Sequence, residues 1–149
     1  MKTTHVVYLG LGSNMGNRRE MLDTACLRIS ELIGPVVRQS AYYESEPWGF
    51  ESENLFLNAV VCCHTTLTPR QLLRTTQRIE RQLGRKQKSK NGEYHDRPID
   101  IDILLYDDLT VDEPDLKIPH PLMYQRSFVM EPLKEITSPA PSPSSQPSS

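Results

Sequence analysis

The segment from Val36 to His64 decides the fold and reads VVRQSAYYESEPWGFESENLFLNAVVCCH. Val36 to Tyr43 and Leu55 to His64 are typical of β-strands, and Glu44 to Asn54, with its proline and glycine, is typical of a loop. A hairpin between consecutive strands forces antiparallel pairing. The segment therefore predicts the antiparallel part of a sheet.

Helical patterns lie on both sides of this hairpin. Between Met21 and Ile33, apolar residues recur at spacings of three and four, and Gly34 ends the pattern. Thr68 and Pro69 predict an N-cap and first residue for a second helix, which stops at Gly84. Both helices can cover one face of a sheet.

Two further strands complete the order β-α-β-β-α-β. Val6 to Leu11 is the first strand, and Ile99 to Leu105 is the last. This order predicts an α+β sandwich of the ferredoxin-like kind, with a mostly antiparallel sheet and helices on its faces. Beyond it we expect a short edge strand at 109–111 and a short helix at 128–135.

Composition limits the number of domains and the kinds of partner. The 149 residues suit one domain, expected at 1–136, while the Pro/Ser-rich residues 137–149 cannot bury enough apolar surface and are expected to form a disordered tail. The 17 basic and 19 acidic residues nearly cancel, so no nucleic-acid partner is indicated. Without a signal segment or a long apolar run, a cytoplasmic protein away from membranes is expected. A monomer is also expected. Cys26, Cys62 and Cys63 are expected to fill the core.

Asp100 and Asp102 are the main candidates for chemistry. Alternate residues of a strand share a face, so these carboxylates lie about 7 Å apart on one side. Mg²⁺ prefers one or two carboxylates together with phosphate oxygens, so the pair can hold metal against a nucleotide triphosphate. A solvated strand face is the alternative for such a pair taken alone. The alternation also predicts that Leu104 shares the face of the acids and that the core-facing residues are Ile99, Ile101, Ile103 and Leu105.

Other polar residues strengthen the first interpretation. Arg85 and Arg97 offer planar forks for phosphate oxygens, although the lysines at 86, 88 and 90 also fit a solvated charge run. Asn58 shares a face with Phe56 and needs hydrogen-bond partners, which either a flat heterocycle or other groups of the sheet would supply. The glycine-rich segment 10–17 matches no nucleotide fingerprint and is expected to be a turn and loop whose amides can approach a ligand. The histidines show no zinc spacing.

Taken together, these motifs resemble the 6-hydroxymethyl-7,8-dihydropterin pyrophosphokinase family of folate biosynthesis. The matching segments follow the family's order and are LGLGSNMG at 9–16, LNAV at 57–60, TQRIE at 76–80, GR at 84–85, RPIDIDIL at 97–104, IPHP at 118–121 and RSF at 126–128. The resemblance implies a ferredoxin-like fold and transfer of pyrophosphate from ATP to the pterin, with release of AMP.

The resemblance also implies residue roles. Asp100 and Asp102 would hold two Mg²⁺ ions, and Arg85 and Arg97 would contact the phosphates. The ATP-binding set would be Arg85 and Arg97 together with Gln77, Glu80, His120 and Arg126. The pterin-binding set would be Ser45, Glu46, Trp48, Phe56, Asn58, Tyr94 and Phe128.

Departures from the family pattern lie in the loops. His95 and Asp96 stand where the family usually has Gly-Pro, and Tyr94 stands in for a common tryptophan. Glu46 and Trp48 replace small apolar residues. Two other functions keep the same acids: a nucleotidyltransferase that releases pyrophosphate, and a non-catalytic ferredoxin-like binding module.

Overall fold

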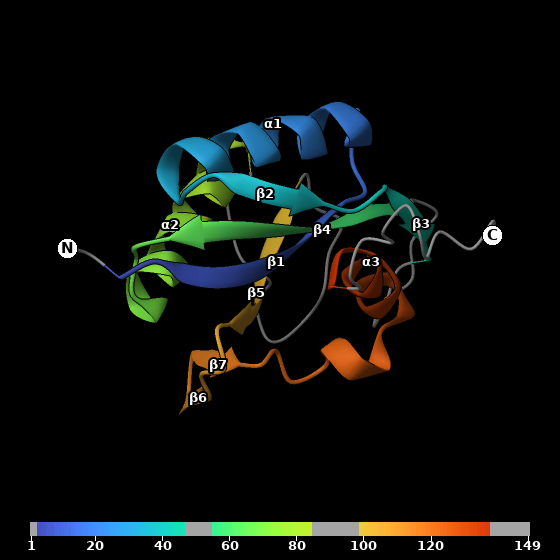
Figure 1. Cartoon of the computed structure of the whole chain (residues 1–149). Coiled ribbons are helices and arrows are strands. Elements are labelled where there is room, and N and C mark those ends of the chain that lie inside the picture. The colour runs from blue at the N-terminus through green and yellow to red at the C-terminus, as the bar shows by residue number, and fades with distance from the viewer. Residues whose placement is uncertain (1–2, 47–54, 85–98, 138–149) are drawn as a thin grey trace, which may run out of the picture.

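The computed structural model describes residues 3–46, 55–84 and 99–137 (Figure 1). Its strands are β1 (His5–Ser13), β2 (Val36–Gln39), β3 (Tyr43–Ser45), β4 (Phe56–Thr65), β5 (Asp100–Tyr106), β6 (Val111–Glu113) and β7 (Leu116–Ile118). Its helices are α1 (Arg18–Leu32), α2 (Pro69–Gln82) and α3 (Ser127–Thr137), with a short 3₁₀ turn at Met123–Gln125. None of these helices is long and apolar enough to cross a membrane.

The main sheet is antiparallel and has the order β2-β4-β1-β5, with β3 also paired to β4. The predicted fold class, an α+β ferredoxin-like sandwich, is confirmed. The boundary between a domain at 1–136 and a tail remains a prediction, since 138–149 lie outside the described residues.

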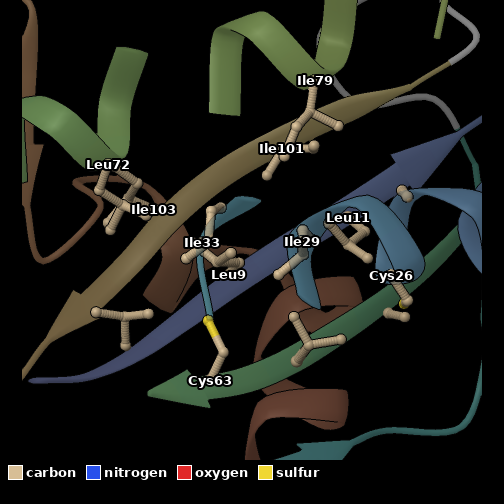
Figure 2. Close-up of a cluster of buried hydrophobic side chains, with 14 of the residues drawn as sticks. Leu9, Leu11, Cys26, Ile29, Ile33, Cys63, Leu72, Ile79, Ile101 and Ile103 are labelled. Atoms are coloured by element: carbon tan, nitrogen blue, oxygen red, sulfur yellow. The ribbon is translucent and has the colours of Figure 1, made fainter. Parts of the chain in front are cut away.

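Two layers of apolar side chains sandwich the sheet. On one face, Ile29 and Ile33 from α1 and its C-terminal cap, and Leu72 and Ile79 from α2, point toward Leu9 and its neighbours on the strands (Figure 2). On the other face, Val129, Leu133 and Ile136 of α3 pack against Val60 and Cys62 of β4. Figure 1 shows α1 and α3 on opposite sides of the strands. The three cysteines are buried, as predicted.

The predicted strand from Val36 to Tyr43 is interrupted at Ser40. The amide of Val60 donates to Ser40 Oγ at 2.9 Å, and the amide of Ser40 donates to the Val60 carbonyl at 2.9 Å. A side-chain oxygen thus replaces a backbone acceptor, which breaks the regular ladder. The result is two short strands, β2 and β3, on the same partner.

Two sequence predictions for β5 and the segment that follows it are wrong in detail. Leu9 pairs with Ile103 and Tyr8 with Leu105, so Leu104 is an extra residue in β5. This bulge turns both Leu104 and Leu105 toward the α3 side, whereas Leu105 was expected in the core with the isoleucines. The short strand expected at 109–111 is instead a separate hairpin of β6 and β7.

Candidate active site

The two acids lie on β5 opposite glycines of β1. Asp100 pairs with Gly12 and Asp102 with Gly10, so no β1 side chain stands beside either carboxylate. The neighbouring isoleucines of β5 turn the other way and are at most 5% exposed. The predicted alternation therefore holds up to the bulge, and both acids are half-buried.

Asp102 lies close to other negatively charged side chains. Burial comes first, and the negative charges of Asp100 and Glu80 and a hydrogen bond with Asp100 add to it, so the pKa of Asp102 is raised well above its usual range. The guanidinium of Arg126 lowers this pKa in opposition. A carboxyl group among other negative charges fits a divalent cation, since a bound cation would favour the charged form of Asp102.

No group of three His, Cys, Asp or Glu side chains suited to a metal is found in the described ranges. Among the described residues, the donor set is the carboxylate pair of β5. Magnesium commonly binds in this way, through one or two carboxylates, phosphate oxygens and water. The pair fits Mg²⁺ beside a phosphate ligand.

Glu80 supports the metal-facing strand. It is 5% exposed on α2, and its Oε2 accepts the amide of Ile101, which lies between the two acids, at 2.7 Å. β5 is the edge strand of the sheet, so this carboxylate satisfies an edge amide that would otherwise need another acceptor. Gln77, one turn earlier on α2, is half-buried.

Asn58 forms a second polar centre on β4. It is 4% exposed, and its Nδ2 donates to the Tyr43 carbonyl at 3.0 Å and to Ser45 Oγ at 2.8 Å. A Cβ atom placed on Gly12 would lie 3.3 Å from Asn58 Oδ1 and 3.5 Å from the Phe56 ring. The predicted shared face of Phe56 and Asn58 is confirmed, and the amide oxygen lies over Gly12.

Gly12 joins these two centres. It pairs with Asn58 of β4 on one side and with Asp100 of β5 on the other. Neighbouring strands are about 4.8 Å apart, so the backbones of Asn58 and Asp100 are separated by about 10 Å across a residue without a side chain. The glycine-rich segment expected to be a turn from Gly10 onward is thus partly strand, because β1 continues to Ser13.

A third group lies on the segment that crosses from β7 to α3. The amide of His120 donates to the Leu104 carbonyl at 3.1 Å, which attaches this segment to the bulge of β5. Burial lowers the pKa of His120, Arg126 lowers it further, and Asp100 opposes both. The Arg126 guanidinium lies over the Phe128 ring, 5.7 Å from its centroid. These electrostatic contacts bring His120, Arg126 and Phe128 to the same end of the sheet as the acids.

The predicted site residues therefore divide into those that the fold gathers and those outside its described part. The gathered set comprises Ser45, Phe56, Asn58, Glu80, Asp100, Asp102, His120, Arg126 and Phe128, with Gln77 on α2 and exposed Glu46 beside Ser45. Trp48, Arg85, Tyr94 and Arg97 lie outside the described residues. Sequence reasoning missed Gly12 as the link, although its alternation with Gly10 in a predicted strand could have indicated a strand face without side chains of its own.

Comparison with known proteins agrees with this geometry. The sequence profile of 7,8-dihydro-6-hydroxymethylpterin-pyrophosphokinase (HPPK) matches residues 8–138. A relative from Porphyromonas gingivalis named 2-amino-4-hydroxy-6-hydroxymethyldihydropteridine pyrophosphokinase is 52% identical over 132 residues, covering 88% of this chain and 90% of the relative. Relatives of the same name from Aquifex aeolicus and Bacillus subtilis are 43% and 39% identical, covering 87% and 89% of this chain and 79% and 78% of their own.

Solved structures share the fold. A structure described as HPPK-DHPS in complex with substrates has a TM-score of 0.71 and 14% identity, and it matches 89% of this chain. Wild-type Plasmodium falciparum HPPK-DHPS with pteroate has a TM-score of 0.69 and 16% identity, and it matches 90% of this chain. This chain spans 40% and 39% of the length of those two chains.

Fold and site together define a small α+β enzyme with a carboxylate pair on β5 and a hydrogen-bonded asparagine on β4. The chain belongs to the 7,8-dihydro-6-hydroxymethylpterin-pyrophosphokinase family, as its motifs predicted.

Proposed function

We propose that this chain is an ATP-dependent pyrophosphokinase of folate biosynthesis. It transfers the β,γ-pyrophosphoryl group of ATP to the hydroxymethyl oxygen of 6-hydroxymethyl-7,8-dihydropterin, and the products are the pterin diphosphate and AMP. The observation that carries the proposal is the row Asn58–Gly12–Asp100 across three neighbouring strands. It combines a group that reads a heterocycle edge with a group that holds metal, on either side of a residue that has no side chain of its own.

The pterin occupies the Asn58 side of this row. Asn58 Nδ2 is already satisfied by Tyr43 and Ser45, so its Oδ1 is the atom that accepts a hydrogen bond from the amino or ring N–H groups of the pterin. Phe56 and Phe128 supply apolar surface for the ring, and Ser45, Glu46, Trp48 and Tyr94 complete the pterin side. The hydroxymethyl group then points across Gly12 toward β5.

The triphosphate occupies the β5 side. Asp100 and Asp102 hold two Mg²⁺ ions, which neutralise phosphate charge and orient the reacting oxygens when bound. Arg85 and Arg97 contact the phosphates, and Gln77, His120 and Arg126 bind ATP. Glu80 acts on ATP indirectly, because its hydrogen bond to the Ile101 amide fixes the strand that carries both acids.

Catalysis in this arrangement rests on alignment and charge neutralisation. The hydroxymethyl oxygen attacks the β-phosphorus, the bond from that phosphorus to the α,β-bridging oxygen breaks, AMP leaves with that oxygen, and the hydroxyl proton is released.

The proposal also covers a monomer in the cytoplasm, without nucleic-acid or membrane partners, whose catalytic domain is 1–136 and whose tail is 137–149. The near balance of 17 basic and 19 acidic residues supports this proposal, since it gives no broad attraction to nucleic acid or anionic lipid. Sedimentation velocity of the intact chain tests the monomer.

Product analysis tests the function. ATP, Mg²⁺ and the hydroxymethyl dihydropterin should yield one AMP for each pterin consumed, and chelation of Mg²⁺ should abolish turnover. Formation of ADP would make the chain an ordinary kinase, and pterin-independent release of pyrophosphate would favour the nucleotidyltransferase. Binding of the pterin without any turnover would favour the non-catalytic module.

A further inference from the structure

Hydrogen bonds join the last turns of α3 to the connection between β2 and β3. The Glu135 carboxylate accepts the amide of Ala41 with both oxygens, at 3.1 and 3.2 Å. Its Oε1 also accepts the hydroxyl of Tyr43 at 2.6 Å. The hydrogen bond to Glu135, more than partial burial, raises the pKa of Tyr43, so its phenol is a neutral donor. In a further hydrogen bond to α3, Arg38 Nη1 of β2 donates to the Ile136 carbonyl at 2.9 Å.

Tyr43 connects Glu135 to Asn58, the residue proposed to hydrogen-bond the pterin edge. It pairs with Asn58 on β4, and its carbonyl accepts Asn58 Nδ2. Ser45, two residues further along β3, supplies the second acceptor of the same amide. The position of β3 therefore sets the direction of the Asn58 amide, and Glu135 is a charged group that holds β3 from the α3 side.

The other end of α3 carries Phe128, the proposed stacking residue. Between the two ends, the helix packs on β4 through Val129, Leu133 and Ile136. Apolar packing of this kind is non-directional, so it tolerates small sliding of the helix, whereas hydrogen bonds to a fixed carboxylate do not. The hydrogen bonds of Glu135 thus fix the position of Asn58 relative to that of Phe128.

We propose that Glu135 is a positioning residue for the pterin half of the site, acting through Tyr43 on the orientation of Asn58. This role rests on the proposed function and concerns one substrate only. The acids of β5 are not part of the Glu135–Tyr43–Asn58 chain of hydrogen bonds, so binding of ATP should not depend on it.

Steady-state kinetics of three variants test this role. Glu135→Ala should raise the KM for the hydroxymethyl dihydropterin about tenfold, the effect of one hydrogen bond to a charged acceptor, while the KM for ATP and kcat stay within about twofold. Glu135→Gln keeps one acceptor oxygen and should recover most of the pterin KM. Glu131→Ala, which removes the same charge one turn earlier on α3, is the matched control and should leave both KM values unchanged.

A variant at the other end of the hydrogen bond guards against a folding defect. Thermal melting identifies any loss of fold in Glu135→Ala, and Tyr43→Phe then replaces it because only a hydroxyl is lost. Where Glu135→Ala keeps its fold, combining it with Tyr43→Phe should give a less than additive rise in pterin KM. An unchanged pterin KM in both single variants Glu135→Ala and Tyr43→Phe, or an equal rise in the KM for ATP, overturns the role of Glu135 alone. A wild-type chain that forms no AMP overturns the proposed function and this role together.

Discussion

Replacement of Gly12 by alanine separates function from stability at the centre of the site. The new Cβ would lie 3.3 Å from Asn58 Oδ1, which is tighter than most contacts of that kind, and 3.5 Å from the Phe56 ring, an ordinary van der Waals distance. Asn58 must then move by a few tenths of an ångström, and its hydrogen bonds of 2.8 and 3.0 Å resist that movement. Gly12 lies inside β1, and its backbone has no positive φ, so alanine itself is tolerated there.

The expected loss follows from the hydrogen bond to the pterin. Misplacing one such bond costs about 1–3 kcal/mol, so kcat/KM for the pterin should fall about 5- to 150-fold. The melting temperature should fall only slightly, because the gain of about 0.4–1 kcal/mol that alanine brings through the unfolded state offsets part of the strain at Asn58.

The matched control is Gly10→Ala, two residues earlier on the same strand. Its Cβ would meet the flexible end of Leu104 at 3.4 Å, so the pterin side should be disturbed less. Kinetics and thermal melts of both variants give the comparison. A Gly12→Ala enzyme with wild-type kcat/KM, or one that loses activity only because it unfolds, would refute the reasoning.

Three further predictions concern the metal pair, a close backbone contact and a surface carboxylate. Asp100→Ala and Asp102→Ala should each lower kcat at saturating Mg²⁺ by at least about a hundredfold, as for loss of a strong electrostatic stabiliser, and near-normal rates in both would remove the metal assignment. Gly34→Ala should destabilise by more than about 2 kcal/mol in urea unfolding, since its Cβ would lie 1.8 Å from the His64 carbonyl oxygen. Although partial burial acts the other way, hydrogen bonds from the Val6 amide and His5 lower the pKa of Asp107. The contribution of Asp107 to the free energy of unfolding is therefore present above pH 3.8, and it is lost as the pH falls through the lower pKa of the folded state. Asp107→Asn, which tolerates the positive φ of this position, should flatten that part of the stability profile, and an unchanged profile would contradict it.

Much of the fold was predictable because local pattern and global topology agree. Helical spacing between Met21 and Ile33 and strand alternation in Ile99–Ile103 both survive in the structure. The errors arise where a contact distant in sequence overrides the pattern. Ser40 breaks a strand because its hydroxyl bonds to Val60, twenty residues away, and the bulge at Leu104 depends on the register with β1.

The site was predictable where residue chemistry is explicit. Acids on a strand and an asparagine among apolar residues attract notice because such groups need a cation or hydrogen-bond partners. Gly12 and Glu135 did not, since one acts by lacking a side chain and the other through contacts more than ninety residues away in sequence. Those contributions are set by strand pairing and helix docking, which the one-dimensional pattern of residue types does not contain.

The most direct measurement follows the β-phosphorus of ATP. With ATP labelled by ³²P at the β position, Mg²⁺ and the hydroxymethyl dihydropterin, pyrophosphoryl transfer across the Asn58–Gly12–Asp100 row predicts that all transferred label is in the pterin product and that the AMP is unlabelled. Label retained in ADP, or released as free pyrophosphate, would contradict the proposed function.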